Sequence, residues 1–422
     1  MSRPAPPGID QPTAPRTARE RVRRRAWGLI AAVAPMESLP PAGIVASAWP
    51  FPTVVLSAFM IAWGAECAQF LVSRGMALAI LAWLQALPEF AVEAVIAWKQ
   101  QIHFMTANFT GSLRLLVGLG WPLIFATAVF GTWKREKRLL RRIHLDEENC
   151  VEVVALSLPI AYFFFIYAKA TLNLIDAAIL LSMYVLYLWV LQKLPPRELE
   201  HVEDLEYIPR TIMKLAARPR LWAIGGLFAG GGVILALSAE PFLHSMLRMA
   251  LYFGVSQYLF IQWLAPFLSE FPEKLSAFNW ARQRGKAPMA LLNMVSANIN
   301  QWTMLAAMIP VVYSLSIGAP SSIPFDDFQR KEILLTIAQS TLGLMLLMNM
   351  EFSIIEAAGI FLLWGAQFLV PHLHEEVTWI YFGWVAFELT VTLAQRRRFL
   401  ALTAFVRVWK RHGWRRSAPP GS

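Results

Sequence analysis

Long apolar runs, repeated along the chain, restrict its fold more than any other feature. A helix needs about 20 consecutive apolar residues to cross the hydrocarbon core of a bilayer. Backbone within lipid must satisfy its own hydrogen bonds, so such runs form helices rather than open sheets. The sequence therefore predicts an all-α polytopic membrane protein. The runs predict eleven spans, at 53–72, 77–98, 105–131, 150–168, 171–194, 221–247, 255–280, 289–316, 331–350, 352–371 and 377–394.

The composition supports this fold class and excludes several others. Hydrophobic residues make up 57% of the chain and charged residues 16%, whereas about 25% of the residues in a soluble domain are charged. These values exclude a soluble enzyme, a secreted disulfide scaffold and an outer-membrane barrel, whose strands would alternate apolar and polar residues. The two cysteines, Cys67 and Cys150, make no disulfide framework and no metal pattern. We expect neither a cofactor nor enzyme activity, because the spans contain no Ser-His, Cys-His or HExxH arrangement.

The positive charges lie beside the predicted spans. The net charge is +10, and more than half of the 38 Lys and Arg residues fall within 1–26, 134–142 and 395–422. The positive-inside rule places the second and third clusters, together with the loop 195–220, in the cytoplasm. No basic face alternates with aromatic residues that would stack on bases. We therefore expect the cell membrane as the location, membrane lipid and inorganic cations as partners, and no nucleic acid.

The N-terminal region allows three interpretations. Residues 1–26 are rich in Pro and Arg and are predicted to be a disordered basic tail, but strict alternation of the spans would place this tail outside the cell. Either residues 27–48 form a twelfth, proline-kinked span, or they are a signal peptide that ends near Ala46, or the tail departs from the rule. We favour the twelfth span, which makes 27–52 an extra span rather than a linker and places both termini in the cytoplasm.

Short sequence elements recur in the same order in the two halves of the chain. Five spans separate the start of one copy from the start of the next, and because five is odd the second copy must lie upside down in the bilayer. Inverted repeats are typical of secondary transporters, whose substrate site lies near the midplane. We predict a first repeat at 53–194, a cytoplasmic loop at 195–220, a second repeat at 221–371, and an extra span with a basic tail at 372–422. The paired elements are 64–66 and 238–240, 88–89 and 272–273, 106–108 and 296–298, and 174–178 and 354–358.

The repeated elements resemble the motifs of the cation/calcium exchanger superfamily. Each repeat of that family has G-A-E, then G-T-S-L-P-E, then G-N-x-x-G-S-N-x-x-N. The first copy here has GAECAQF, LQALPEF and ANFTGSLRLL, and the second has SAEPFL, FLSEFPEK and ANINQWTML. The resemblance covers about residues 53–371. It implies a fold of two inverted five-helix repeats and a secondary antiporter that exchanges Ca²⁺, or a similar divalent cation, for H⁺ or Na⁺ by alternating access.

Departures from the family's motifs leave the driving ion open. The Thr-Ser before Leu-Pro-Glu is replaced by Gln85-Ala86 in the first copy and by Ser269-Glu270 in the second. The second copy also has Gln301-Trp302 where the motif has Gly-Ser. These departures equally support an alternative function, a transport-inactive exchanger-like membrane scaffold or regulator. The sequence makes no prediction of the oligomeric state.

Each Pro-Glu pair offers oxygen ligands to a cation. A proline within a helix frees the carbonyl four residues earlier, so the prolines before Glu89 and Glu273 free the carbonyls of Leu84 and Leu268. Two such breaks that face each other would bring two carboxylates and several carbonyl oxygens to one point, and Ca²⁺ takes six to eight oxygen ligands. Two carboxylates balance the charge of Ca²⁺. Protons or sodium must replace it when it leaves, because an unneutralised acid pair at the midplane is costly.

The resemblance adds Asn108, Ser112 and Asn298 as candidate cation ligands. Asn108 and Ser112 are four residues apart and share a helix face, although hydrogen bonding between helices would explain them equally well. Glu93 lies one turn beyond Glu89 on the same helix face. It is either a ligand on the access path or an acid at the membrane interface. We expect structural roles for four further acids: Glu66, Glu240, Asp176 and Glu356. We expect Arg114 to be a buried counter-ion and residues 372–376 to form a solvated turn between spans.

Glu270 stands where the family has a hydroxyl, three residues before Glu273. In a regular helix this spacing puts both carboxylates on one face. If Glu270 points inward, the site contains three acids, and two close carboxylates favour the binding of a proton when the divalent cation leaves. This arrangement would make H⁺ the counter-ion. Alternatively, Glu270 faces a polar loop or pairs with Lys274, four residues on.

Overall fold

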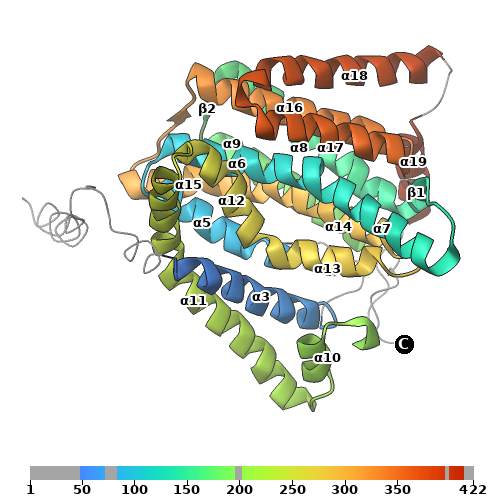
Figure 1. Ribbon diagram of the computed structural model, residues 1–422, viewed down its shortest axis with the longest axis horizontal. Coiled ribbons are helices and arrows are strands. Elements are labelled where there is room, and N and C mark those ends of the chain that lie inside the picture. The colour runs from blue at the N-terminus through green and yellow to red at the C-terminus, as the bar shows by residue number, and fades with distance from the viewer. Residues whose placement is uncertain (1–47, 72–82, 195–201, 395–398, 413–422) are drawn as a thin grey trace, which may run out of the picture. The chain divides into compact units, whose positions relative to one another are not determined.

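The computed structural model describes residues 48–71, 83–194, 202–394 and 399–412. The described residues are almost entirely helical (Figure 1), in agreement with the all-α prediction. The predictions for 1–47, including the signal peptide and all but the last residue of the twelfth span, lie outside them. Six helical stretches are long and apolar enough to cross a membrane: Pro50–Ala68, Ile102–Glu136, Glu147–Lys169, Leu174–Gln192, Ala217–Tyr252 and His374–Ala394.

The first half of the chain contains five helical regions. Its elements are α3 (Pro50–Ala68), α5 (Leu87–Trp98), α6 (Ile102–Leu115), the π-helical segment η1 (Leu116–Gly120), α7 (Trp121–Glu136), β1 (Arg142–His144), η2 (Glu147–Asn149), α8 (Cys150–Lys169), β2 (Thr171–Leu172) and α9 (Leu174–Gln192).

The same order of elements recurs after a short connection. The connection contains η3 (Val202–Asp204) and α10 (Tyr207–Met213). The second copy consists of α11 (Ala217–Tyr252), α12 (Gln257–Ser269), α13 (Phe271–Ala281), α14 (Ala287–Asn300), the π-helical segment η4 (Gln301–Leu305), α15 (Ala306–Ile317), β3 (Ile323–Pro324), α16 (Asp327–Leu347), β4 (Glu351–Ser353) and α17 (Ile354–Leu369). The chain continues with η5 (Pro371–Leu373), α18 (His374–Ala394) and α19 (Leu400–His412).

A helix is broken before each Pro-Glu pair, as the prolines predict. Residues 83–85 are helical, Ala86 is a turn, and α5 begins with Leu87-Pro88. In the second copy α12 ends at Ser269, Glu270 is a turn, and α13 begins with Phe271-Pro272. Proline is tolerated in the first turn of a helix, where its missing N–H has no partner to lose. Each glutamate after a proline therefore lies in the first turn of a helix inside the protein.

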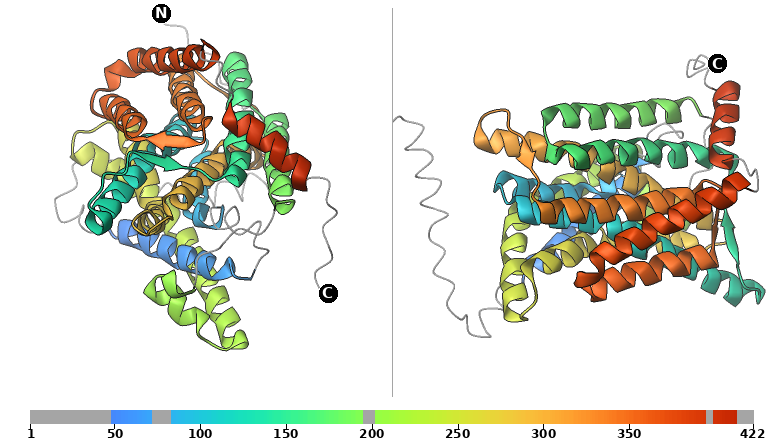
Figure 2. Two further views of the ribbon diagram at one scale, coloured as in Figure 1. Left: turned by 90° about the vertical axis from the view of Figure 1, so that its right-hand side faces the viewer. Right: turned by 90° about the horizontal axis from the view of Figure 1, so that it is seen from above.

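Two short antiparallel strand pairs connect the copies at opposite ends of the helices (Figures 1 and 2). In one pair Ile143 of β1 lies opposite Phe352 of β4, and in the other Leu172 of β2 lies opposite Ile323 of β3. β1 follows α7 in the first copy, and β3 follows α15, the equivalent helix of the second. Equivalent connections thus lie at opposite ends, which is the arrangement that an inverted repeat produces.

Close backbone contact holds α6 against α12. A Cβ on Gly111 would lie 1.8 Å from the backbone oxygen of Gln262, so only glycine permits this approach. Gly118 of η1 lies similarly close to Trp364 of α17, where a Cβ would be 2.3 Å from the ring atom Cδ1. The two contacts fix the height and rotation of α6, which carries Asn108 and Ser112.

The C-terminal region contains a helix that the sequence analysis missed. The prediction for the residues after the last span was a basic tail, but 400–412 form α19, which packs on α8 and lies across its end (Figure 2). Ala401, Ala404 and Val408 are buried, at the three- and four-residue spacing of an amphipathic helix. Its hydrophobic side is too narrow and its charge too high for the criterion of a membrane span, which explains the miss.

Candidate cation site

The two helix breaks bring Glu89 and Glu270 to the same place inside the protein. Glu89 is 1% exposed and Glu270 is fully buried. Ser112 on α6 donates to Oε1 of Glu89, and its Oγ lies 2.9 Å from Oε1 of Glu270. A serine hydroxyl has one proton to donate, so it cannot satisfy both carboxylates. At least one of the two contacting carboxylate oxygens therefore lacks a proton from Ser112.

Gln301 bridges the same two acids from the second copy. Its Nε2 lies 2.8 Å from Oε2 of Glu89 and 3.0 Å from Oε1 of Glu270. Its own Oε1 is buried and has no hydrogen-bond partner among the described residues. A buried amide oxygen without a donor is a ready ligand for a hard cation. Gln301 was not a candidate in the sequence analysis, although a glutamine within an apolar helix, at the position of Gly111 in the first copy, is a signal of its own.

Glu270 both points into the site and pairs with Lys274. The Lys274 ammonium forms an ion pair with Oε2 of Glu270, while Oε1 faces Ser112 and Gln301. Lys274 is only 3% exposed. The two outcomes that the sequence left as alternatives therefore occur together, because the two carboxylate oxygens have different neighbours.

Glu273 has a different neighbour from Glu89. It is 1% exposed, and the Nδ2 of Asn293 lies 3.5 Å from its Oε1. The sequence analysis did not single out Asn293. With Ser296 and Asn300 it forms a polar stripe at spacings of three and four residues on α14, and this pattern was available in the sequence.

The remaining predicted ligands make no hydrogen bond with Glu89 or Glu270 among the described residues. Asn108 donates to Oε2 of Glu93 at 2.6 Å, so it contacts this acid and not Glu89. Both amide atoms of Asn298 are buried and have no hydrogen-bond partner among the described residues. Leu84 and Leu268 lie in the last helical turns before the two breaks, and their carbonyls remain predicted ligands. Among the described residues, no group of three or more His, Cys, Asp or Glu side chains has the geometry to hold a metal ion.

A cavity of about 620 Å³ lies at one end of the helices. Glu66 and Ser276 line it, and the Ser276 hydroxyl donates to Oε1 of Glu66 at 2.7 Å. Ser276 lies three residues after Glu273 on α13, so the two side chains share a helix face. Glu206, before α10, also lines the cavity and accepts a hydrogen bond from Trp63 on α3 at 2.9 Å. The cavity thus comes within one helical turn of Glu273.

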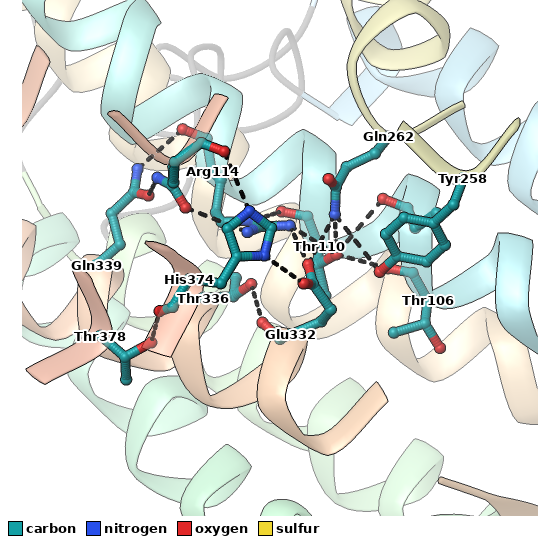
Figure 3. A network of polar contacts seen from close by, with 12 residues as sticks. Thr106, Thr110, Arg114, Tyr258, Gln262, Glu332, Thr336, Gln339, His374 and Thr378 are labelled. Atoms are coloured by element: carbon teal, nitrogen blue, oxygen red, sulfur yellow. Dashed lines mark hydrogen bonds and ion pairs between the residues drawn. The ribbon is translucent and has the colours of Figure 1, made fainter. Parts of the chain in front are cut away.

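Arg114 lies in a separate buried network beside the site (Figure 3). Its Nη2 is 2.6 Å from Oε2 of Glu332 on α16, and this confirms the expected role as a buried counter-ion. Gln262 donates to the same carboxylate at 2.9 Å. His374 lies 2.6 Å from its other oxygen. The prediction of a solvated turn at 372–376 is therefore wrong for His374. This residue begins α18, and its ring contacts the buried carboxylate of Glu332.

The acids predicted to be structural have structural partners. Asp176 and Glu356 are the third residues of α9 and α17, and each completes a capping box with the residue before its helix. Glu240 forms an ion pair with Lys99 at 2.5 Å on the surface.

Comparison with protein families gives one match that covers both copies. A family model described as "Sodium/calcium exchanger protein" matches residues 43–192 and again residues 223–371. The two matched segments correspond to the two copies of the helical arrangement described above. No curated protein sequence matches the chain.

Two solved structures show the same fold. A crystal structure of the H⁺/Ca²⁺ exchanger CAX is 29% identical, with a TM-score of 0.79, and the match covers 93% of this chain and 98% of that one. The sodium-calcium exchanger NCX_Mj, soaked with 100 mM Na⁺ and 10 mM Sr²⁺, is 17% identical with a TM-score of 0.51, over 78% of this chain and 99% of that one.

Proposed function

Because this chain belongs to the sodium/calcium exchanger family, we propose that it is a secondary antiporter that exchanges Ca²⁺, or a similar divalent cation, for H⁺ across the cell membrane. Members of this family are multi-pass membrane transporters rather than catalytic enzymes. Transport would proceed by alternating access, with the cation bound between the two repeats near the midplane.

The bridged pair of Glu89 and Glu270 is the observation that carries this proposal. Two carboxylates and a hydroxyl meet in the protein interior, and all three are hard oxygen ligands suited to Ca²⁺. The amide nitrogen of Gln301 holds the two carboxylates together from the second copy. Glu273, a predicted ligand, and Lys274, a fixed positive charge, lie one turn further along α13. With Lys274 paired to Glu270, the charges left on Glu89 and Glu273 match a divalent cation.

The choice of H⁺ rests on similarity and on ligand chemistry. The exchanger CAX, described as an H⁺/Ca²⁺ exchanger, is more similar in sequence and fold than NCX_Mj. Carboxylates bind protons directly, so protons can neutralise the acids when the divalent cation leaves. This exchange avoids an uncompensated acid pair in the membrane interior.

A transport-inactive scaffold or regulator is the second candidate. The ion pair between Lys274 and Glu270 favours it, because a lysine inside the site repels a bound cation. Cation flux separates the two candidates directly.

The test is Ca²⁺ uptake into proteoliposomes with an imposed pH gradient. We expect the wild type to take up Ca²⁺ and Glu89→Gln, which keeps the size of the side chain, to lose uptake. Glu240→Gln is the matched control, because Glu240 is exposed and forms its ion pair with Lys99 at the protein surface. Correctly inserted wild-type protein that moves no divalent cation under any gradient would support the scaffold instead.

A further inference from the structure

A buried lysine lies within the candidate cation site. Lys274 is 3% exposed and forms an ion pair with the fully buried Glu270. Burying an ammonium group is costly unless a close anion compensates it. Removal of either partner would leave a buried unpaired charge, so each residue accounts for the presence of the other.

The pair belongs to the same hydrogen-bonded group as Glu89. Ser112 and Gln301 both contact Oε1 of Glu270, at 2.9 and 3.0 Å, and both also contact Glu89. Lys274 binds the other oxygen of Glu270. The Lys274 side chain is therefore paired with an acid that shares two hydrogen-bond donors, Ser112 and Gln301, with Glu89.

We infer that the Lys274 ammonium takes the place of a Na⁺ ion beside Glu270, so that divalent cation exchange by this protein needs no Na⁺. The inference rests on the proposed function, in which Glu89 and Glu273 neutralise the divalent cation. It adds a role for Glu270, which departs from the family's motif, and for its partner Lys274.

Charge and tethering explain why Na⁺ would lose this competition. The Glu270 carboxylate and the Ser112 hydroxyl supply oxygen atoms that would also suit a monovalent cation. Lys274 presents the same charge from four residues away on the same helix, and a tethered group has an effective concentration in the millimolar range or above. Unlike Na⁺, the ammonium cannot leave. Beside Glu270, a Na⁺ gradient therefore has no site at which to supply energy.

The experiment measures Na⁺ binding to the purified full-length protein. The unfolding temperature is followed in NaCl and in choline chloride at equal ionic strength. We expect no NaCl-specific change in the wild type or in Lys274→Arg, which keeps the charge. Lys274→Gln exposes Glu270 to solution cations, and we expect a saturable NaCl-specific rise of a few degrees. The double variant Lys274→Gln/Glu270→Gln removes the acid as well and should lose that rise.

Two results would overturn the inference. One is a saturable NaCl-specific rise in the wild type, or Ca²⁺ transport in wild-type proteoliposomes that a Na⁺ gradient drives. The other is a folded Lys274→Gln protein with no response to NaCl. If Lys274→Gln fails to fold, a NaCl-specific rise in the wild type or in Lys274→Arg would still overturn the inference. A CaCl₂-specific rise in the unfolding temperature of the wild type tests the proposed function separately. If this rise is absent while the Na⁺ results are as expected, the proposed function alone is rejected.

Discussion

Glu89 is the residue on which the candidate site converges, since both Ser112 and Gln301 donate to it from different repeats. Its identification from the sequence was possible because a Pro-Glu pair inside an apolar run has few structural explanations. Its partner was harder to identify. The symmetry of the motifs points to Glu273, whereas the hydrogen bonds join Glu89 to Glu270. Ser112 and Gln301 join these two acids, because each contacts both. The packing of α6 against η4 brings Ser112 and Gln301 together.

Gln301 provides a test of the site that does not alter its charge. Gln301→Leu removes two hydrogen bonds to carboxylates, each worth about 1.5–3 kcal/mol. We expect the apparent affinity for the divalent cation to fall by at least about tenfold. Concentration dependence of Ca²⁺ uptake measures this effect. Gln257→Leu is the same change outside the site, where the amide donates to the carbonyl of Leu247, and it should leave the affinity unaltered. Equal affinities in both variants would contradict the assignment.

Arg114 should matter for stability in a different way from the site residues. Its guanidinium pairs with Glu332 in a fully buried environment, and removing one member of such a pair costs about 3–5 kcal/mol. We expect Arg114→Met to lower the unfolding temperature markedly. Arg114→Met/Glu332→Gln should be more stable than the single variant, because no unpaired carboxylate remains. If the double variant is as unstable as the sum of the two single ones, the pair is not coupled.

The helices follow the predicted spans closely where a run is continuously apolar. α8 (Cys150–Lys169) matches the prediction of 150–168, and α9 (Leu174–Gln192) matches 171–194. The π-helical segments η1 and η4 were not predictable, because no residue pattern distinguishes them from α-helix. Each contacts the other repeat, η1 with α17 and η4 with α9. α19 was missed for a different reason. The spacing of Ala401, Ala404 and Val408 is that of an amphipathic surface helix, whereas the predictions rested on apolar runs long enough to span a membrane.

Glycines test the helix contacts around the site. Gly111→Ala places a methyl group against the backbone of Gln262, and overpacking of this kind costs about 1–3 kcal/mol. The change should lower both the unfolding temperature and the transport rate, because α6 carries Ser112. Gly226→Ala in α11 meets open space and should stabilise by up to about 1 kcal/mol. Similar unfolding temperatures for the two variants would show that α6 does not lie so close to α12.

At the scale of the whole molecule, the orientation in the membrane remains a prediction from charge. If residues 27–48 form a span, both termini lie in the cytoplasm. Ser2→Cys and Ser422→Cys should then resist an impermeant thiol reagent in intact cells and react after permeabilisation. The two native cysteines are buried and should contribute little background. Labelling of Ser2→Cys from outside intact cells would contradict the prediction of a twelfth span. A mature chain that lacks residues 1–48 would indicate cleavage of a signal peptide instead.

The two strand pairs have a consequence for the order in which the protein is made. β1 and β2 belong to the first repeat, and their partners β4 and β3 belong to the second. Synthesis runs from the N-terminus, so the first repeat inserts while both of its strands still lack a partner and their edge groups are hydrated. The nascent first half therefore waits as an incomplete intermediate with one open edge at each end of its helices. Neither strand pair can form before its second strand, within residues 323–353, has been synthesised.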